Sequence, residues 1–141
     1  MIILDSDHLS ILRYRDSARA QSLANRLAVA TEMPVATSIA NVEEAMRGWL
    51  AALAKERRIE RQIFAYRELS ELFAFFSGYT IALLDTNSSS MFTRFRKSGV
   101  KIGTMDLKTA SIALANNALL LTANRRDFEK VPGLRFENWL E

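Results

Sequence analysis

The sequence predicts an α/β fold, in which a central, mainly parallel sheet of four to five strands carries helices on both faces. Short apolar runs alternate along the chain with longer segments of helical periodicity, which is the pattern of strand–helix–strand units. Proline or glycine separates several of these segments. The sequence shows no internal repeat, low-complexity segment or interdomain linker, so we expect one domain over residues 1–141.

The first half of the chain is expected to begin with a buried strand. The apolar run after Met1 ends at Asp5, and Asp7 is suited to be the N-cap of the helix that follows. Pro34 ends the second helical segment, and Ser38 is the expected N-cap of the third helix. The expected elements are a strand at 1–5, helices at 7–14 and 17–31, a strand at 35–37 and a helix at 38–54.

The second half continues the alternation of helices and strands. Its long first helix is expected to turn one apolar face inward. That face comprises Ile59, Ile63, Tyr66, Leu69, Phe73 and Phe76. Ser98 and Gly99 are expected to end the next helix as a C-cap. The expected elements are helices at 56–76, 86–97 and 106–118 and strands at 81–84, 119–122 and 134–136.

Composition excludes several classes of function. The sequence contains no cysteine, which rules out disulfides, zinc–thiolate sites and cysteine nucleophiles. The net charge of +3, from 19 Lys and Arg against 16 Asp and Glu, is too small to indicate nucleic-acid binding by itself. No basic region precedes the N-terminal apolar residues, and charges interrupt every long apolar stretch. We therefore expect no signal peptide, no membrane partner and a cytoplasmic location.

Four separated acids are the strongest functional signal in the sequence. They are Asp5, Glu44, Asp106 and Asp127. Asp5 ends the first apolar strand, and Asp127 follows the expected strand at 119–122. The carboxyl ends of neighbouring parallel strands meet at one edge of a sheet, so these acids are expected to converge there. Gathered carboxylates repel one another and favour a hard cation such as Mg²⁺, which predicts a phosphate-handling metal site.

Neighbouring residues distinguish Glu44 from Glu43. Arg47 lies four residues after Glu43, which is the favourable order for an ordinary ion pair on a helix surface. Glu44 instead has the small residues Ala40 and Gly48 four positions to either side. We expect these small neighbours to let this face of the helix approach the sheet edge closely.

Ordinary structural roles remain open for the other candidates. The helix dipole favours an acid such as Asp106 near a helix N-terminus whatever its function. Asp127 could equally be a turn residue, braced by Thr122 and Asn124, and His8 is expected to face solvent. The residues that could hold substrate phosphates are Arg47, Lys101, Arg125 and Arg126, for each of which surface solvation explains the charge equally well.

Taken together, four segments resemble PIN-domain ribonucleases of the VapC-like toxin type, from bacterial type II toxin–antitoxin pairs. The segments are Ile3-Leu4-Asp5-Ser6-Asp7, Glu44-Ala45-Met46-Arg47-Gly48, Ile102-Gly103-Thr104-Met105-Asp106-Leu107, and Leu121-Thr122-Ala123-Asn124-Arg125-Arg126-Asp127-Phe128 with Val131-Pro132-Gly133-Leu134 after it. Their order and spacing extend the resemblance from end to end, most weakly between Arg57 and Ser98. One departure is Thr104, where many relatives carry a further acid.

The resemblance implies a three-layer α/β/α fold and endonucleolytic cleavage of RNA that depends on Mg²⁺, with Mn²⁺ as a substitute. It also implies a small cognate antitoxin as partner, a homodimer, and products with 5′-phosphate and 3′-hydroxyl ends. By the resemblance, Ser6 is a hydroxyl support, and the catalytic and metal-binding residues are Asp5, Glu44, Asp106 and Asp127.

Two rival functions remain. Asp5 and Asp7 after a strand also fit a phosphatase that forms an aspartyl-phosphate, with Asp5 as nucleophile and Asp7 as general acid. Leu9 stands where that motif has Thr or Val, which counts against a phosphatase. The other rival is a non-catalytic RNA- or protein-binding module on the same fold, against which the four intact acids argue.

Overall fold

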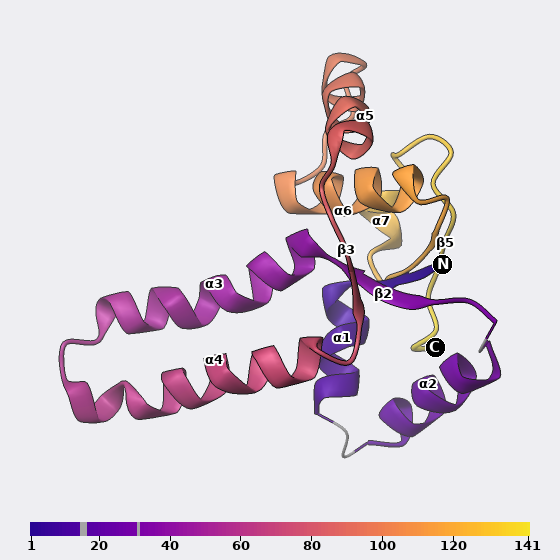
Figure 1. Cartoon of the computed structure of the whole chain (residues 1–141). Helices are drawn as coiled ribbons and strands as arrows, with labels where there is room; N and C mark the ends of the chain where they lie inside the picture. The colour runs from indigo at the N-terminus through magenta and orange to yellow at the C-terminus, as the bar shows by residue number, and fades with distance from the viewer. Residues whose placement is uncertain (15–16, 31) are drawn as a thin grey trace.

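Five parallel strands form the central sheet of the described chain, with β1 in the middle (Figure 1). The computed structural model describes residues 1–14, 17–30 and 32–141. The strand order is β3-β2-β1-β4-β5, and every pairing is parallel. The strands are β1 (Ile2–Leu4), β2 (Val35–Ser38), β3 (Thr80–Ala82), β4 (Leu119–Leu121) and β5 (Phe136–Glu137). The predicted parallel α/β sheet is confirmed.

Helices cover both faces of this sheet, which gives three layers (Figure 1). One face carries α1 (Ser6–Arg13), α2 (Ala18–Val29), α3 (Ile39–Lys55) and α4 (Ile63–Phe76), with a 3₁₀ turn, η1 (Ile59–Arg61), before α4. The other face carries α5 (Thr86–Lys97), α6 (Thr104–Ala115) and α7 (Arg125–Phe128). None of the helices in the described ranges is both long and apolar enough to cross a membrane.

The central strand explains why the core has two halves. Ile3 packs on the side of α6, whereas Ile2 and Leu4 pack on the side of α1, and all three are fully buried. Alternate residues of a strand point to opposite faces, so a strand covered on both faces is apolar throughout. Each of these side chains contributes roughly 1.5–3 kcal/mol by leaving water. The apolar run at the N-terminus therefore sets the position of the sheet edge where Asp5 lies.

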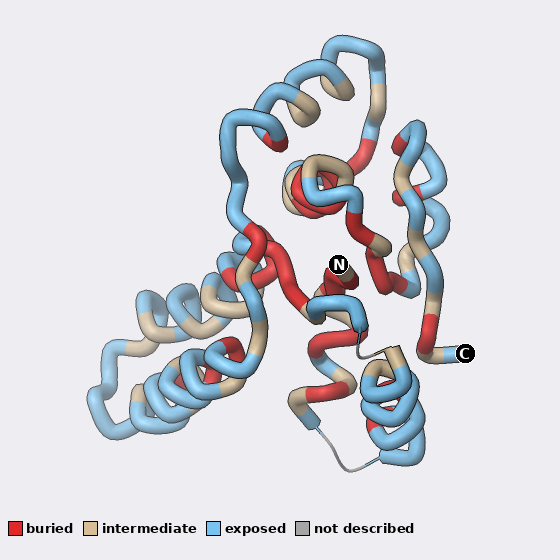
Figure 2. The backbone as a smooth tube through the Cα atoms, turned by 45° about the vertical axis from the view of Figure 1, so that its right-hand side comes forward, coloured by how far each residue is buried: buried red, intermediate tan, exposed pale blue. Residues whose placement is uncertain are grey.

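The prediction of one long helix at 56–76 is wrong in two respects. The chain breaks after α3, passes through η1 and begins α4 only at Ile63. The face predicted to be buried is largely exposed, with Ile59 74% and Phe73 63% accessible. α3 and α4 form a hairpin that projects from the sheet, and Figure 2 shows exposed residues along much of it. Periodicity identified an apolar face, but the hairpin projects from the sheet, so much of that face is not buried against it.

One helix begins at a different N-cap residue from the one predicted. α1 begins at Ser6 with Asp5 as its N-cap, so the assignment of that role to Asp7 is wrong. The predicted caps at Ser38 and at Gly99 are confirmed, and Gly99 has a φ of 90° that ends α5. The second helix ends at Val29, and its predicted last residue, Thr31, lies outside the described residues.

The strand boundaries also shift. β3 lies earlier than the predicted strand at 81–84, and Leu83 and Leu84 lie beyond it as exposed residues. β5 covers Phe136–Glu137 rather than 134–136. These edge strands are only two or three residues long, so sequence pattern alone defines their ends poorly.

Candidate active site

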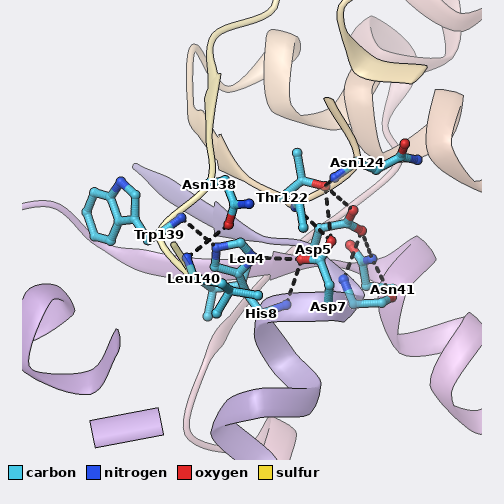
Figure 3. Close-up of polar contacts among 12 residues, drawn as sticks. Leu4, Asp5, Asp7, His8, Asn41, Thr122, Asn124, Asn138, Trp139 and Leu140 are labelled. Atoms are coloured by element: carbon cyan, nitrogen blue, oxygen red, sulfur yellow. Dashed lines mark hydrogen bonds and ion pairs between the residues drawn. The ribbon is translucent and has the colours of Figure 1, made fainter. Parts of the chain in front are cut away.

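Asp5 lies at the carboxyl edge of the sheet, where several hydrogen bonds hold it (Figure 3). It follows β1, and its backbone N–H donates to the Leu121 carbonyl of β4 at 2.9 Å. Its Oδ1 accepts hydrogen bonds from the Ser6 backbone N–H at 2.9 Å and from Asn41 Nδ2 at 2.8 Å. Its Oδ2 accepts one from Thr122 Oγ1 at 2.8 Å. The carboxylate is thus fixed by three elements of the fold.

Burial dominates the ionisation of Asp5. The side chain is only 7% exposed, and burial raises its pKa above the ordinary value. The hydrogen bond from Thr122 lowers the pKa, and the charge of Asp7 raises it again. The result is a raised pKa, although the carboxylate accepts several hydrogen bonds. A carboxylate in this environment gains from a nearby positive charge.

Glu44 reaches the same edge from α3. Its Oε1 accepts a hydrogen bond from Ser6 Oγ at 2.8 Å, and Asn41 Nδ2 donates to that hydroxyl at 3.0 Å. Asn41 therefore connects Glu44, through Ser6, with Asp5. Asn41 lies three residues before Glu44, so the two share one face of the helix. Sequence reasoning missed Asn41, although this spacing from Glu44 was available as a signal.

Glu43 and Glu44 have different surroundings, as predicted, but one reason given for that prediction, the small residue Gly48, was wrong. Glu43 pairs with Arg47 on the surface of α3, and Lys108 Nζ lies 3.9 Å from its Oε1. Gly48 does not mark a close approach to the sheet, because a Cβ added there would meet nothing within 4 Å. Glu44 reaches the edge because it stands near the start of α3, in the second turn after the Ser38 cap.

Asp106 and Asp127 face one another across a shared donor. Asn124 Nδ2 donates to Asp127 Oδ2 at 3.1 Å and to Asp106 Oδ2 at 3.4 Å. Asn124 is the N-cap of α7, and its own backbone N–H donates to Thr122 Oγ1 at 3.1 Å. The bracing role predicted for Thr122 and Asn124 is therefore seen, and it extends to Asp106 in the first turn of α6.

The acids lie close enough together to affect the ionisation of Asp106. The pKa of Asp106 is raised to about 6, first by burial and then by the negative charges of Asp5, Asp127, Glu44 and Asp7. Acids distant in sequence therefore act on one another at one edge of the sheet. In the ranges that the structure describes, no three acidic or histidine side chains stand close enough to hold a metal ion as they are. Amide and hydroxyl donors lie between the carboxylates instead.

The donor chemistry of this edge fits a hard cation. The acids offer carboxylate oxygens, which are the ligands that Mg²⁺ prefers. Burial raises the pKa values of Asp5 and Asp106, and the charges of neighbouring acids raise them further, so their ionised forms lack a compensating positive charge. A divalent cation would remove that repulsion by drawing the carboxylates together.

His8 contradicts the prediction of a solvent-facing side chain. It is fully buried, and its Nε2 accepts a hydrogen bond from the Trp139 backbone N–H at 3.1 Å (Figure 3). An accepting Nε2 places the ring proton on Nδ1, which lies 2.6 Å from Asp7 Oδ1. His8 thereby joins α1 to the C-terminal segment, and both of its ring nitrogens are engaged inside the protein.

Asp7 is a structural partner of the site. Its Oδ2 accepts hydrogen bonds from the Ala123 backbone N–H at 2.8 Å and from Thr122 Oγ1 at 3.3 Å. Burial opposes the ionisation of Asp7, but the hydrogen bonds from His8 and Ala123 outweigh it and hold the pKa of Asp7 below its ordinary value. Asp7 therefore ties the turn that carries Asn124 to the start of α1.

The predicted phosphate-holding residues occupy different surroundings. Arg47 is paired with Glu43 on α3, and Arg125 is 85% exposed with its Nε 3.9 Å from Glu129 Oε2. Arg126 is exposed on α7. Lys101 lies in the loop between α5 and α6, where it lines a hollow with Lys130. The roles of these cations in binding substrate remain predictions.

Comparisons with known proteins agree with this fold. No family model matches the chain. Ribonuclease VapC2 of Rickettsia felis (strain ATCC VR-1525 / URRWXCal2) is 45% identical over 47 residues, which are 33% of this chain and 35% of that protein. The matched stretch thus spans about a third of the relative's length.

Solved structures match over nearly the whole chain. The structure of VapBC2 from Rickettsia felis bound to a promoter DNA fragment has a TM-score of 0.74 and 26% identity, and covers 99% of both chains. DNA-bound VapBC from Salmonella typhimurium has a TM-score of 0.72 and 20% identity, over 98% of this chain and 97% of that one. VapBC-1 from nontypeable Haemophilus influenzae has a TM-score of 0.67 and 22% identity, over 100% of both. The chain is thus similar to a VapC ribonuclease over part of its sequence, and to VapBC structures over nearly the whole of its fold.

Proposed function

We propose that this protein is a metal-dependent endoribonuclease that acts as the toxin of a toxin–antitoxin pair. The observation that carries the proposal is the meeting of the acids at one edge of the sheet, where Asn124 bridges Asp106 and Asp127, and where burial and then the charges of the other acids raise the pKa of Asp106 to about 6. The similarity to Ribonuclease VapC2 and to VapBC structures supports the same activity. In this proposal RNA is the substrate, and its phosphodiester bonds are hydrolysed at the carboxylate edge.

Asp5, Glu44, Asp106 and Asp127 are the residues that would hold Mg²⁺, or Mn²⁺ in its place. When bound at such a site, the cation activates water and offsets negative charge on phosphate oxygens. Asp5 would provide a fixed oxygen ligand, because hydrogen bonds from Thr122 and Asn41 already orient it. Glu44 is exposed and joined to the others through Ser6, so it has more freedom to adjust.

The protein's own side chains support hydrolysis without a covalent intermediate. Water adds across the P–O3′ bond and leaves a 5′-phosphate and a 3′-hydroxyl. His8 is fully buried, with both ring nitrogens engaged, so it is unsuited to serve as a general base for RNA. Asn124 holds Asp106 and Asp127 toward one another, and Ser6 orients Glu44.

The phosphatase alternative fits the geometry less well. A general acid must be protonated at working pH, whereas the pKa of Asp7 lies below its ordinary value. Both oxygens of Asp7 accept hydrogen bonds from the protein. Asp5 is likewise surrounded by donors that hold it in place. These contacts favour a structural role for Asp7 over a role as general acid.

A small cognate antitoxin is the partner that completes the proposal. The matched structures from Rickettsia felis, Salmonella typhimurium and Haemophilus influenzae are VapBC structures. A groove beside the acids, lined by Glu44, Asn41 and the apolar side chains of Leu72, Phe75 and Phe76, is available for such a contact. We also propose a homodimer and a cytoplasmic location for the protein.

The proposal is tested by incubating the purified protein with total RNA and Mg²⁺, with and without a chelator. Cleavage should require the cation, and Asp5→Asn should lower its rate by about 100-fold or more, as loss of an essential charged group does. The chain provides a matched pair of glutamates for this assay. Glu44→Gln should lower the rate strongly, whereas Glu43→Gln, which changes the same charge one residue away, should not. Full activity in Asp5→Asn, or equal losses in the two glutamine variants, would count against the proposal.

A further inference from the structure

A cationic hollow lies beside the carboxylate edge. We propose that it is a subsite for a backbone phosphate of the RNA strand that flanks the bond to be cut; this rests on the proposed ribonuclease function. The hollow has a volume of about 480 Å³ and lies between the α5–α6 loop and the segment after α7. Its lining residues are Ser98, Gly99, Val100, Lys101, Lys130 and Pro132.

Lys130 connects this hollow to the acids. Its Nζ lies 3.9 Å from Asp127 Oδ1, and the Asn124 side chain links Asp127 in turn to Asp106. Lys101 stands on the other wall, three residues before the start of α6, whose first turn carries Asp106. A strand whose scissile phosphate meets the acids would therefore pass both lysines with an adjacent phosphate.

The backbone that presents Lys101 is held in place before any ligand binds. Arg96 Nη1 donates to the Val100 carbonyl at 3.1 Å and to the Ile102 carbonyl at 2.9 Å, on either side of Lys101. Ile102 is buried in the core, and Gly99 makes the tight turn at the end of α5. A fixed loop reduces the entropy lost when a phosphate is bound.

The positive surface continues from the hollow along α5. A second hollow, which shares Ser98 and Pro132 with the first, is lined by Arg94 and Lys97. Among the described residues, neither hollow is lined by an acidic side chain. The helix dipole accounts for basic residues in the last turn of α5, but Lys101 and Lys130 lie outside that helix. The helix dipole does not account for the positions of these two lysines, whereas a phosphate subsite does.

Charge favours RNA as the ligand of this surface. Carboxylates repel a polyanion, so cationic side chains beside them favour binding of the phosphates that flank the scissile one. Proteins that hold single-stranded nucleic acid combine a positively charged groove along the backbone with aromatic side chains on which the bases stack. The second hollow is lined by one aromatic side chain, Phe95, together with the apolar Met91 and Leu114. An acidic polypeptide would use the charges but not this combination.

The subsite is tested by measuring RNA binding rather than cleavage. An Asp5→Asn background prevents hydrolysis while a fluorescent single-stranded RNA is titrated in Mg²⁺ at several salt concentrations. The test variant is Lys101→Gln with Lys130→Gln. The control is Lys55→Gln with Arg57→Gln, which removes the same charge from exposed positions at the far end of the α3–α4 hairpin (Figure 1).

The test variant should raise the Kd about tenfold at low salt, and the control less than about twofold. The slope of log affinity against log salt should also fall in magnitude by about 1.4, because each lost contact to single-stranded phosphate removes about 0.7. Equal effects in the two double variants, or none, would overturn the subsite.

A second probe separates RNA from an acidic polypeptide. If the test variant leaves RNA binding unchanged but loses binding of a fluorescent polyglutamate, the assignment to RNA is wrong. Failure of the proposed function has a different signature, which is the absence of Mg²⁺-dependent RNA cleavage by the unaltered protein. The binding comparison reports on the lysines whichever result that cleavage assay gives.

Discussion

At the scale of single residues, the acids of the site depend on their surroundings in different ways. Asp5 accepts hydrogen bonds from Thr122, Asn41 and the Ser6 backbone, which partly offset the unfavourable effect of its burial. Asp106 accepts a longer hydrogen bond from Asn124, and repulsion from the other acids adds to the effect of burial. The charge on Asp106 therefore opposes folding, and we expect a bound cation to relieve that effect.

Asp106→Asn should stabilise the metal-free protein at pH 7 by about 1 kcal/mol. This figure lies below the full conversion of the pKa shift, because Asp106 is only half-buried and solvent screens the repulsion. The folded pKa of about 6 exceeds the ordinary value of 3.8, so repulsion at Asp106 is absent below about pH 4 and complete above about pH 6. Thermal unfolding in a chelator across this pH range measures the effect.

In that experiment the unaltered protein should lose stability between about pH 4 and pH 6, and Asp106→Asn should lose less. Added Mg²⁺ should stabilise the unaltered protein and have little effect on the variant. The control is Glu43→Gln, which lies on α3 in an ion pair with Arg47. A less stable Asp106→Asn protein in chelator at pH 7 would contradict the electrostatic account of the site.

Residues that support the acids show where sequence reasoning reached its limit. Thr122 and Asn124 could be predicted, because they lie within a few residues of Asp127. The spacing of Asn41 from Glu44 was visible in the sequence, but its contact with Asp5 was not, because the two residues lie 36 positions apart in the chain. Contacts of that kind exist only once β1 and α3 are packed together.

At the scale of elements, the α3–α4 hairpin differs most from expectation. The first two turns of α3 belong to the site, but the far end of the hairpin packs mainly on itself, with the Trp49 and Phe64 rings 5.7 Å apart in an edge-to-face contact. The rest of its surface is largely exposed (Figure 2). We therefore expect substitutions on the face of α3 that lies away from the sheet to have little effect on stability.

Gly48→Ala should raise the free energy of unfolding by about 0.5–1 kcal/mol. Gly48 lies inside α3, and its added Cβ would meet nothing within 4 Å, so the gain in helix propensity is not opposed by a clash. Urea unfolding measures the change. Gly99→Ala serves as the contrasting control, because its φ of 90° makes a side chain there destabilising. A destabilised Gly48→Ala protein would show that Gly48 makes a close contact after all.

At the scale of the whole molecule, the two ends of the chain meet beside the site. His8 on α1 accepts the Trp139 backbone N–H, and Trp139 is itself buried with Arg26 stacked 4.1 Å from its ring. The same histidine contacts Asp7, which holds the turn after β4. The C-terminal segment thus helps to position the acidic edge, through a chain of hydrogen bonds rather than by contact with the acids.

His8→Ala should lower the free energy of unfolding by about 2–4 kcal/mol. The substitution leaves a cavity in the core and removes the partner of a buried backbone N–H, two effects that add. Urea unfolding gives the stability, and hydrogen exchange should show faster exchange of the Trp139 amide. Ser10→Ala, at an exposed position of the same helix, should change stability by less than about 0.5 kcal/mol. Similar stabilities of the two variants would contradict the role assigned to His8.

The parts of the fold that were predictable depend on local rules. The apolar run of β1, the Ser38 cap and the Gly99 cap each express a preference that a few neighbouring residues determine. The buried His8 and the exposed Phe73 were mispredicted, because burial depends on what packs against a residue rather than on its type. The roles of the four acids in catalysis and metal binding stay predictions until the variants are measured.

The sequence by itself determined that the chain alternates parallel strands with helices and that acids follow some of those strands. Only the tertiary structure decided the strand order, with β1 between β2 and β4, and the effect of the other acids on Asp106. The physical reason is the distance along the chain over which each effect acts. Backbone preferences and apolar periodicity act over a few residues, whereas burial and charge repulsion depend on groups that meet only when distant segments pack.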